Sequence, residues 1–159
     1  MTAGRAEGDC LPCSLETADP ATVVFCDELW SCEIFPGYEV PGWFVLRARR
    51  HVVGTDGLDD DEAATYGVRL RDLTRAVRTG VGAERVYAVV FGEQHPHFHT
   101  LVIARPDAVT HEHRSAGILA LRAEMSDPIR ARAAVLPVAR AYRADQPSRS
   151  AEHHMTRGR

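Results

Sequence analysis

Three histidines at alternate positions constrain the fold and chemistry of this chain more than any other feature of its sequence. His95, His97 and His99 are separated by single residues and followed by the apolar sequence Leu101-Val102-Ile103. A β-strand over residues 92–103 would place all three imidazoles on one face, with Leu101, because successive side chains point to opposite faces. Neighbours on that face lie about 6.5 Å apart, which allows two imidazoles to bracket one phosphoryl group or to bind one metal ion. The alternative is a half-polar strand whose histidines are incidental and have no common function.

Length and composition suit one compact domain. The chain has 159 residues, of which 45% are hydrophobic, and its formal net charge is −3, so no basic excess indicates nucleic acid as the main partner. No apolar run approaches the roughly 20 residues of a membrane span, and the polar N-terminus lacks a signal-peptide core. We therefore expect a cytoplasmic protein, with no membrane partner, whose four cysteines are thiols or metal ligands.

Turn residues and apolar alternation predict an antiparallel sheet. Strand-like segments are separated by turns rich in Asp, Pro and Gly, and lie at residues 23–25, 31–35, 43–47, 86–91 and 92–103. The first three suggest a meander, and the last two suggest a hairpin.

Three segments have helical patterns. Asp59 and Glu62 have the spacing of a capping box, and apolar residues at helical spacing follow until Gly80 and Gly82. Shorter helices are expected over residues 115–124 and over residues 128–143, the second kinked or broken at Pro137. We expect a flexible arm over residues 1–9, a single domain over residues 10–145 and a disordered tail over residues 146–159.

Cys10 and Cys13 form a Cys-x-x-Cys motif, whose spacing lets two thiolates bind one tetrahedral zinc ion at about 2.3 Å each. The pair is only half of such a site, and no second Cys-x-x-Cys exists. The other ligands would be histidines, with His51 the best isolated candidate and the histidine strand supplying the fourth. The alternative is surface thiols and a histidine at a helix entry.

Taken in order, these motifs resemble those of the histidine triad superfamily of nucleotide hydrolases and transferases. The resemblance covers roughly residues 10–105 and rests on several matching elements: Cys10-x-x-Cys13, Pro41-Gly42-Trp43-Phe44-Val45-Leu46 leading to Arg50-His51-Val52, the helix start at Leu58–Glu62, and Phe91-Gly92-Glu93 leading into Pro96-His97-Phe98-His99.

The resemblance implies an α+β fold with a five-stranded antiparallel sheet, a long helix and C-terminal helices, usually in a homodimer. It also implies a small nucleotide or nucleoside 5′-phosphate conjugate as partner. The middle histidine of the triad would attack the α-phosphorus, and water or another acceptor would resolve the nucleotidyl-histidine.

The triad can be aligned in two ways. Either His95, His97 and His99 are its three members and His97 is the nucleophile, or His97 is the first member and His99 the nucleophile. We favour the second, because the arginine that commonly follows the third triad position by four residues is then Arg105 without an insertion. Leu101 then occupies the third position.

In this alignment, zinc-bearing relatives imply a structural Zn²⁺ bound by Cys10, Cys13, His51 and His97. A closed four-ligand shell leaves no position for an activated water. The expected catalytic residues are His95, His97 and His99, and the expected substrate-binding residues are Gln94, His95, Leu101 and Arg105.

Other functions stay open. Leu101 cannot donate a hydrogen bond, so one alternative is a zinc-containing nucleotide-binding module with reduced or lost catalysis. A catalytic metal on the three alternate histidines, as in cupin oxygenases, lacks a nearby carboxylate, since the next acid is Asp107. Neither Gly37 nor the segment Gly80-Val81-Gly82 has the lysine pattern of a phosphate-binding P-loop.

Overall fold

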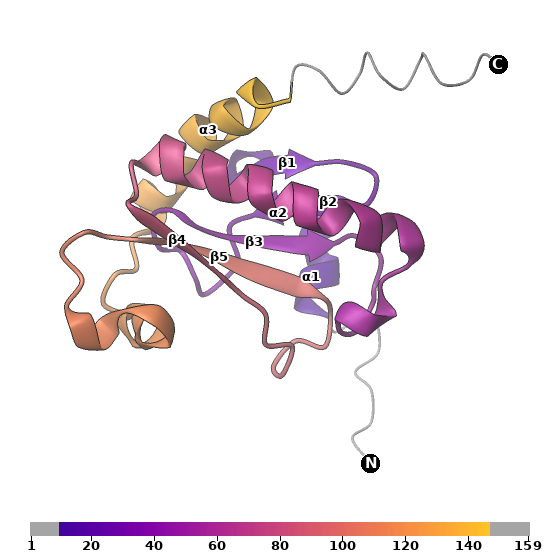
Figure 1. Ribbon diagram of the computed structural model, residues 1–159, viewed down its shortest axis with the longest axis horizontal. Helices are drawn as coiled ribbons and strands as arrows, with labels where there is room; N and C mark the ends of the chain where they lie inside the picture. Colours follow the sequence, from indigo (N-terminus) through magenta and orange to yellow (C-terminus); the bar gives the residue numbers. More distant parts are fainter. Residues whose placement is uncertain (1–9, 147–159) are drawn as a thin grey trace.

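The computed structural model describes residues 10–146 as a five-stranded antiparallel sheet with helices on both faces (Figure 1). The sheet confirms the predicted α+β class, and its strand order is β1-β2-β3-β5-β4. The strands are β1 (Val23–Cys26), β2 (Trp30–Glu33), β3 (Trp43–Ala48), β4 (Arg85–Val89) and β5 (His99–Arg105). The predictions for residues 1–9 and 147–159 fall outside the described residues.

Two long helices, α2 (Asp60–Val81) and α3 (Pro128–Ala144), cover one face of the sheet, and the short α1 (Leu11–Ser14) lies on the other (Figure 1). The 3₁₀ segments η2 (Leu15–Thr17), η3 (Pro20–Thr22), η4 (Thr55–Gly57), η5 (His111–His113) and η6 (Ser115–Leu121) complete the described elements. Within residues 10–146, no helix is long and apolar enough to cross a membrane.

The ends of α2 follow from its sequence. Asp59 caps its first turn, and Asp59 and Glu62 form the predicted capping box. Gly82 ends the helix in the left-handed conformation, with φ 68°. Gly80 does not end it, contrary to the prediction, because it lies inside the last turn. A Cβ at Gly80 would meet the Cα of Val138 at 2.8 Å, so glycine allows α3 to pack closely against α2.

Alternation along β5 divides the core in two. Val102 and Ala104 pack on the helical side with α2 and α3. Leu101 and Ile103 face the opposite side and pack in a second cluster with Trp43 and Ile118. The second face therefore carries the odd-numbered residues of β5, which include His99.

The histidine strand is shorter than predicted. β5 begins at His99, and residues 90–98 connect it to β4 as a loop. Pro96 offers no backbone donor to a sheet, and the His97 amide donates to the carbonyl of His95 at 2.7 Å in a tight turn. His95 and His97 therefore precede the strand, and their imidazoles need not share a face.

The C-terminal part also differs from prediction. Residues 115–121 form the 3₁₀ segment η6 and not an α-helix. Helix α3 continues through Pro137 without a break. Pro137 lies on the exposed side of α3, where water can bind the carbonyl that loses its partner.

Candidate functional site

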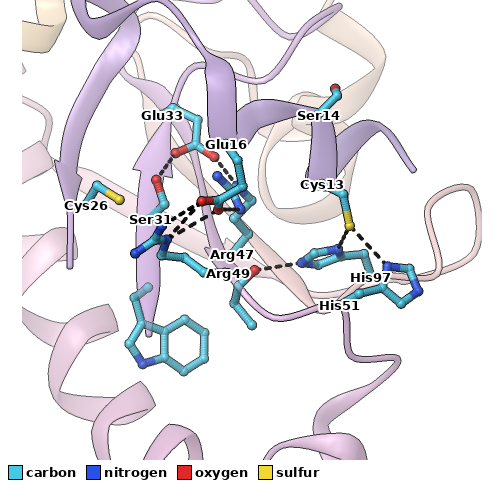
Figure 2. A network of polar contacts seen from close by, with 12 residues as sticks. Cys13, Ser14, Glu16, Cys26, Ser31, Glu33, Arg47, Arg49, His51 and His97 are labelled. Atoms are coloured by element: carbon cyan, nitrogen blue, oxygen red, sulfur yellow. Dashed lines mark hydrogen bonds and ion pairs between the residues drawn. The ribbon is translucent and has the colours of Figure 1, made fainter. Parts of the chain in front are cut away.

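Two thiols and two imidazoles converge beneath the sheet. The candidate ligand atoms of Cys10, Cys13, His51 and His97 all lie within 4.8 Å of one another. The Sγ of Cys13 lies 3.2 Å from Nδ1 of His51 and 3.3 Å from Nδ1 of His97. Figure 2 draws both contacts as dashed lines. The Sγ of Cys10 lies 3.5 Å from the same nitrogen of His97. This donor set fits a tetrahedral metal ion with a closed shell.

A hydrogen bond from its second ring nitrogen, Nε2, orients the imidazole of His97 for metal binding. Its Nε2–H donates to the carbonyl of Ala48, at the end of β3, over 2.7 Å. That bond leaves the lone pair on Nδ1, which faces the thiols. Burial lowers the pKa of His97, so the imidazole stays neutral, which is the form that binds metals.

A network of ion pairs ties the cysteine-bearing segment to the sheet (Figure 2). Glu16 follows Cys13 by three residues and lies 2.7 Å from Arg47 and 2.7 Å from Arg49. Hydrogen bonds from Arg49, and then from Arg47, lower the pKa of Glu16. The network therefore fixes η2, and with it the adjacent Cys-x-x-Cys turn, against β3.

Arg47 is also bound by a residue of the adjacent strand β2. Its Nε donates to the buried carboxylate of Glu33, which accepts a second hydrogen bond from the Ser31 hydroxyl. Burial raises the pKa of Glu33, although the Arg47 guanidinium acts in the opposite direction. Two carboxylates thus face Arg47, whose side chain is 1% exposed.

His99 is oriented by the residue that completes the thiol–imidazole cluster. Its Nδ1 lies 2.6 Å from the carbonyl oxygen of His97. A carbonyl only accepts, so Nδ1 carries a proton, and in the neutral imidazole the lone pair is then on Nε2. Such a tautomer is the one required of a nucleophilic imidazole.

His99 lines a cavity of about 280 Å³. Phe35 stacks on the His99 ring with centroids 5.7 Å apart, and its ring meets that of His95 edge-on at 5.3 Å. The centroids of His95 and His99 are 6.4 Å apart. The residues around the cavity are Phe35, Tyr38, Val45, Val89, Phe91, Gly92, Glu93, Gln94, His95, His99, Leu101 and Leu119.

The structure brings four of the predicted site residues together in this cavity, namely Gln94, His95, His99 and Leu101. His97 is directed to the thiols instead, which separates the cavity histidines from the cluster.

Arg105, which was expected in the substrate site, is not among the residues that line this cavity. It lies at the far end of β5, about 20 Å along the strand from His99 at the usual rise per residue. Its guanidinium pairs with Glu84 at 2.6 Å.

Sequence reasoning missed two parts of the site. Phe35 and Tyr38 form an aromatic wall of the cavity and belong to the loop after β2. Short-range sequence patterns do not indicate that this loop approaches the histidines. The ion-pair network could have been found from the sequence, because Glu33 and Arg47 are charged residues inside apolar strand segments.

Comparison with solved structures shows which fold this is. A Hit-like protein involved in cell-cycle regulation from Bartonella henselae superposes with a TM-score of 0.66 and 12% identity, over 86% of this chain and 99% of that one. A zinc-bound histidine triad family protein from Mycobacterium smegmatis gives 0.66 and 16%, over 87% and 96%. A uridylyltransferase gives the same score and identity, but this chain spans only 47% of its length.

The chain therefore has the histidine triad fold. No protein-family sequence model matches it, and no curated protein matches it by sequence. At these identities the likeness concerns the fold, so the chemistry has to be argued from this chain's own residues.

Proposed function

We propose that this protein is a nucleotide hydrolase or nucleotidyl transferase that acts on a nucleoside 5′-phosphate conjugate through a covalent nucleotidyl-histidine at His99. The observation that carries the proposal is the 2.6 Å contact between Nδ1 of His99 and the carbonyl of His97, on a histidine that lines a cavity. In the neutral imidazole, this contact places the proton on Nδ1 and leaves the lone pair on Nε2. The uridylyltransferase and the histidine triad proteins of the same fold add support.

The reaction has two displacements at phosphorus. The Nε2 lone pair of His99 forms a bond to the α-phosphorus, and the bond to the leaving group breaks with its electron pair, which takes up a proton from solvent. Water or another acceptor then attacks phosphorus, loses its proton and releases the imidazole. We assign Gln94 and His95, which line the same cavity, to the phosphoryl oxygens.

We infer that the metal is zinc, bound by Cys10, Cys13, His51 and His97. A zinc ion in this shell supplies a cross-link between the N-terminal turn and the sheet, and it leaves no position for a catalytic water. The role of His97 is then positional, because its own carbonyl orients His99. The four cysteines are unbridged, which suits a reducing compartment such as the cytoplasm.

We further infer a homodimer that forms through β4. This strand is an edge of the sheet, and the loop that follows exposes Val90 by 45% and Phe91 by 63%. Val90→Glu should therefore shift the protein to monomer in sedimentation velocity. A wild-type protein that sediments as a monomer at micromolar concentration would contradict the inference.

The function is tested by turnover of a panel of nucleoside 5′-phosphate esters, amides and anhydrides. His99→Ala should lower kcat/KM by about a thousandfold or more, since it removes the nucleophile. His113→Ala, a histidine of η5 outside the cavity lining, is the control and should leave it unchanged. A folded His99→Ala variant with wild-type turnover would refute the proposal.

The second candidate is a binding module of the same fold with reduced catalysis. Leu101 favours it, because this aliphatic residue lies on the cavity floor two residues beyond His99, where it cannot donate to a phosphoryl oxygen. Calorimetric binding of nucleotides by a wild-type protein that turns none of them over would favour the module.

A further inference from the structure

A second cavity lies on the helical side of the sheet, away from His99. It has a volume of about 400 Å³ and lies where the C-terminal end of α3 meets β1 (Figure 1). Val24 and Tyr142 of its lining belong to the core cluster on that side, whereas Leu101 of the His99 cavity belongs to the other cluster. The sheet therefore separates the two cavities. The residues that line the second cavity are Val24, Phe25, Cys26, Asp27, Arg69, Tyr142, Arg143 and Gln146.

Three buried polar atoms of this lining have no hydrogen-bond partner within residues 10–146. They are Nε of Arg69, the hydroxyl oxygen of Tyr142 and Nε2 of Gln146. A buried polar group without a partner costs stability, and native proteins contain few of them. All three groups can donate a hydrogen bond. Their presence around one cavity favours a ligand that accepts hydrogen bonds.

Tyr142 is the most buried of these donors, with 4% of its surface exposed. Its ring stacks on that of Phe25, with centroids 4.1 Å apart and an angle of 3° between the planes. Burial raises the pKa of the Tyr142 hydroxyl, although the charge of nearby Arg69 acts in the opposite direction, so the hydroxyl keeps its proton. Arg69 does not satisfy this hydroxyl, because neither group meets a partner with hydrogen-bond geometry.

The charges around the cavity leave one cation uncompensated. The carboxylate of Asp27 is fully engaged, since Oδ1 accepts from the amides of Leu29 and Trp30 and Oδ2 lies 2.7 Å from Arg69. Arg143 also lines the cavity, and its guanidinium pairs with no carboxylate of the described residues. The lining therefore carries two positive charges and one negative charge, which suits a ligand with a single negative charge.

We propose that this cavity binds a small organic monocarboxylate. The carboxylate accepts hydrogen bonds from Arg69, Tyr142 and Gln146, and its charge balances the surplus cation. The apolar part of the ligand packs against Val24 and Phe25. This site is independent of the proposed nucleotidyl chemistry, which takes place on the other face of the sheet.

Calorimetric titration with sodium benzoate at constant ionic strength tests the proposal. The wild-type protein should bind benzoate at least about tenfold more tightly than the neutral isostere benzamide. Tyr142→Phe keeps the ring and removes one donor to a charged group, so it should weaken benzoate binding by about tenfold. Tyr87→Phe is the matched control, because the Tyr87 hydroxyl accepts from the Ser115 amide outside this cavity.

A second pair of variants tests the surplus charge. Arg143→Gln should weaken benzoate binding by about threefold, a modest effect because Arg143 is exposed and its charge is screened by salt. Arg140→Gln, an equal change at an exposed position of α3 outside the lining, should have no effect.

Unfolding in a buffer free of carboxylates tests the unpartnered hydroxyl by itself. Tyr142→Phe loses no hydrogen bond and should be at least as stable as the wild type. Tyr66→Phe loses the 2.7 Å hydrogen bond to Thr100 and should melt about 3 °C lower or more. Saturating benzoate should then stabilise the wild type more than Tyr142→Phe.

Four results would overturn the proposal. They are no benzoate binding by the wild type, equal affinity for benzoate and benzamide, tighter binding of inorganic phosphate than of benzoate, and equal benzoate affinity in the wild type and Tyr142→Phe. A Tyr142→Phe variant that is less stable than the wild type without carboxylate would also contradict it, because the hydroxyl would then already have a partner, such as an ordered water.

Discussion

The carbonyl oxygen of His97 lies 2.6 Å from Nδ1 of His99, so one residue serves both the thiol–imidazole cluster and the cavity. The side chain of His97 faces Cys10 and Cys13, while its backbone fixes the tautomer of His99. Loss of the proposed zinc ion should therefore disturb the proposed nucleophile, His99, without any direct contact between the two. The following variants test this arrangement.

Cys13→Ser should remove most of the zinc, because the Sγ of Cys13 contacts the imidazoles of both His51 and His97. We expect about one zinc per chain in the wild type and a melting temperature lower by roughly 5 °C or more in the variant, since metal binding contributes to folding. Elemental analysis measures the zinc content, and calorimetry measures the melting temperature. Cys26→Ser, at an exposed cysteine of β1, is the control. Freshly purified, reduced wild-type protein with negligible zinc would rule out the site.

Glu16→Gln should weaken zinc binding by about tenfold while the four ligands stay in place. The substitution keeps the shape of Glu16 but removes the charge that pairs with Arg47 and Arg49, so η2 is held less firmly. Competition with a chromophoric chelator measures the affinity. Glu28→Gln, at an exposed position between β1 and β2, provides the matched control. Equal affinity in the two variants would show that the cysteine turn is held by the metal alone.

Arg47→Met should destabilise the fold by about 3 kcal/mol, because it leaves Glu33 buried without its cation. The double variant Arg47→Met/Glu33→Leu should recover most of the loss. Urea unfolding measures both. A double variant no more stable than the single one would mean that packing, and not the unpaired charge, accounts for the loss.

The Arg47→Met variant should also gain stability in acid relative to neutral pH. Burial raises the pKa of Glu33 in the folded state, so folding favours its protonated form. The penalty is present above the folded pKa and is relieved as the pH falls through that value towards the unfolded value of about 4.5. Unfolding free energies across this range measure the effect.

Leu101→His should raise hydrolysis of a generic nucleoside phosphoramidate by more than tenfold, because it adds a donor on the cavity floor near His99. Nucleotide affinity should change little, since the new contact acts mainly in the transition state. An active variant of an inactive wild type would favour the binding-module alternative. A folded variant without any gain would show that the cavity lacks no donor at this position.

Local patterns predicted the parts of this protein that local chemistry determines. The capping box at Asp59 starts α2, and alternation along β5 correctly separates Val102 from Leu101. The alternation of the histidines predicted too long a strand, because the side chain of His97 turns towards the thiols of Cys10 and Cys13, more than 80 residues away in sequence. A pattern with period two carries no information on such a distant partner.

The family resemblance implied the four residues of the thiol–imidazole cluster, which lie far apart in sequence, whereas the cavity could be predicted only where neighbours in sequence stay neighbours in space. Gln94, His95 and His99 remain together because the loop before β5 folds over the strand's first residue. Arg105 was placed by its spacing to the triad, but an extended strand carries it to the opposite end of the sheet. Phe35 enters from the loop after β2, and the strand order that brings it there is a property of the whole fold.

The most direct measurement is the intact mass of the protein after a rapid denaturing quench at alkaline pH, where the N–P bond of a nucleotidyl-histidine is stable, during turnover of a nucleoside 5′-phosphate ester. The wild-type protein should gain the mass of one nucleotidyl group per chain, and His99→Ala should gain none while it remains folded and zinc-loaded. An adduct that persists in His99→Ala and disappears in a folded, zinc-loaded His97→Ala variant would contradict the assignment of the nucleophile. An adduct in neither the wild type nor any variant, while substrate is consumed, would contradict covalent catalysis by this site.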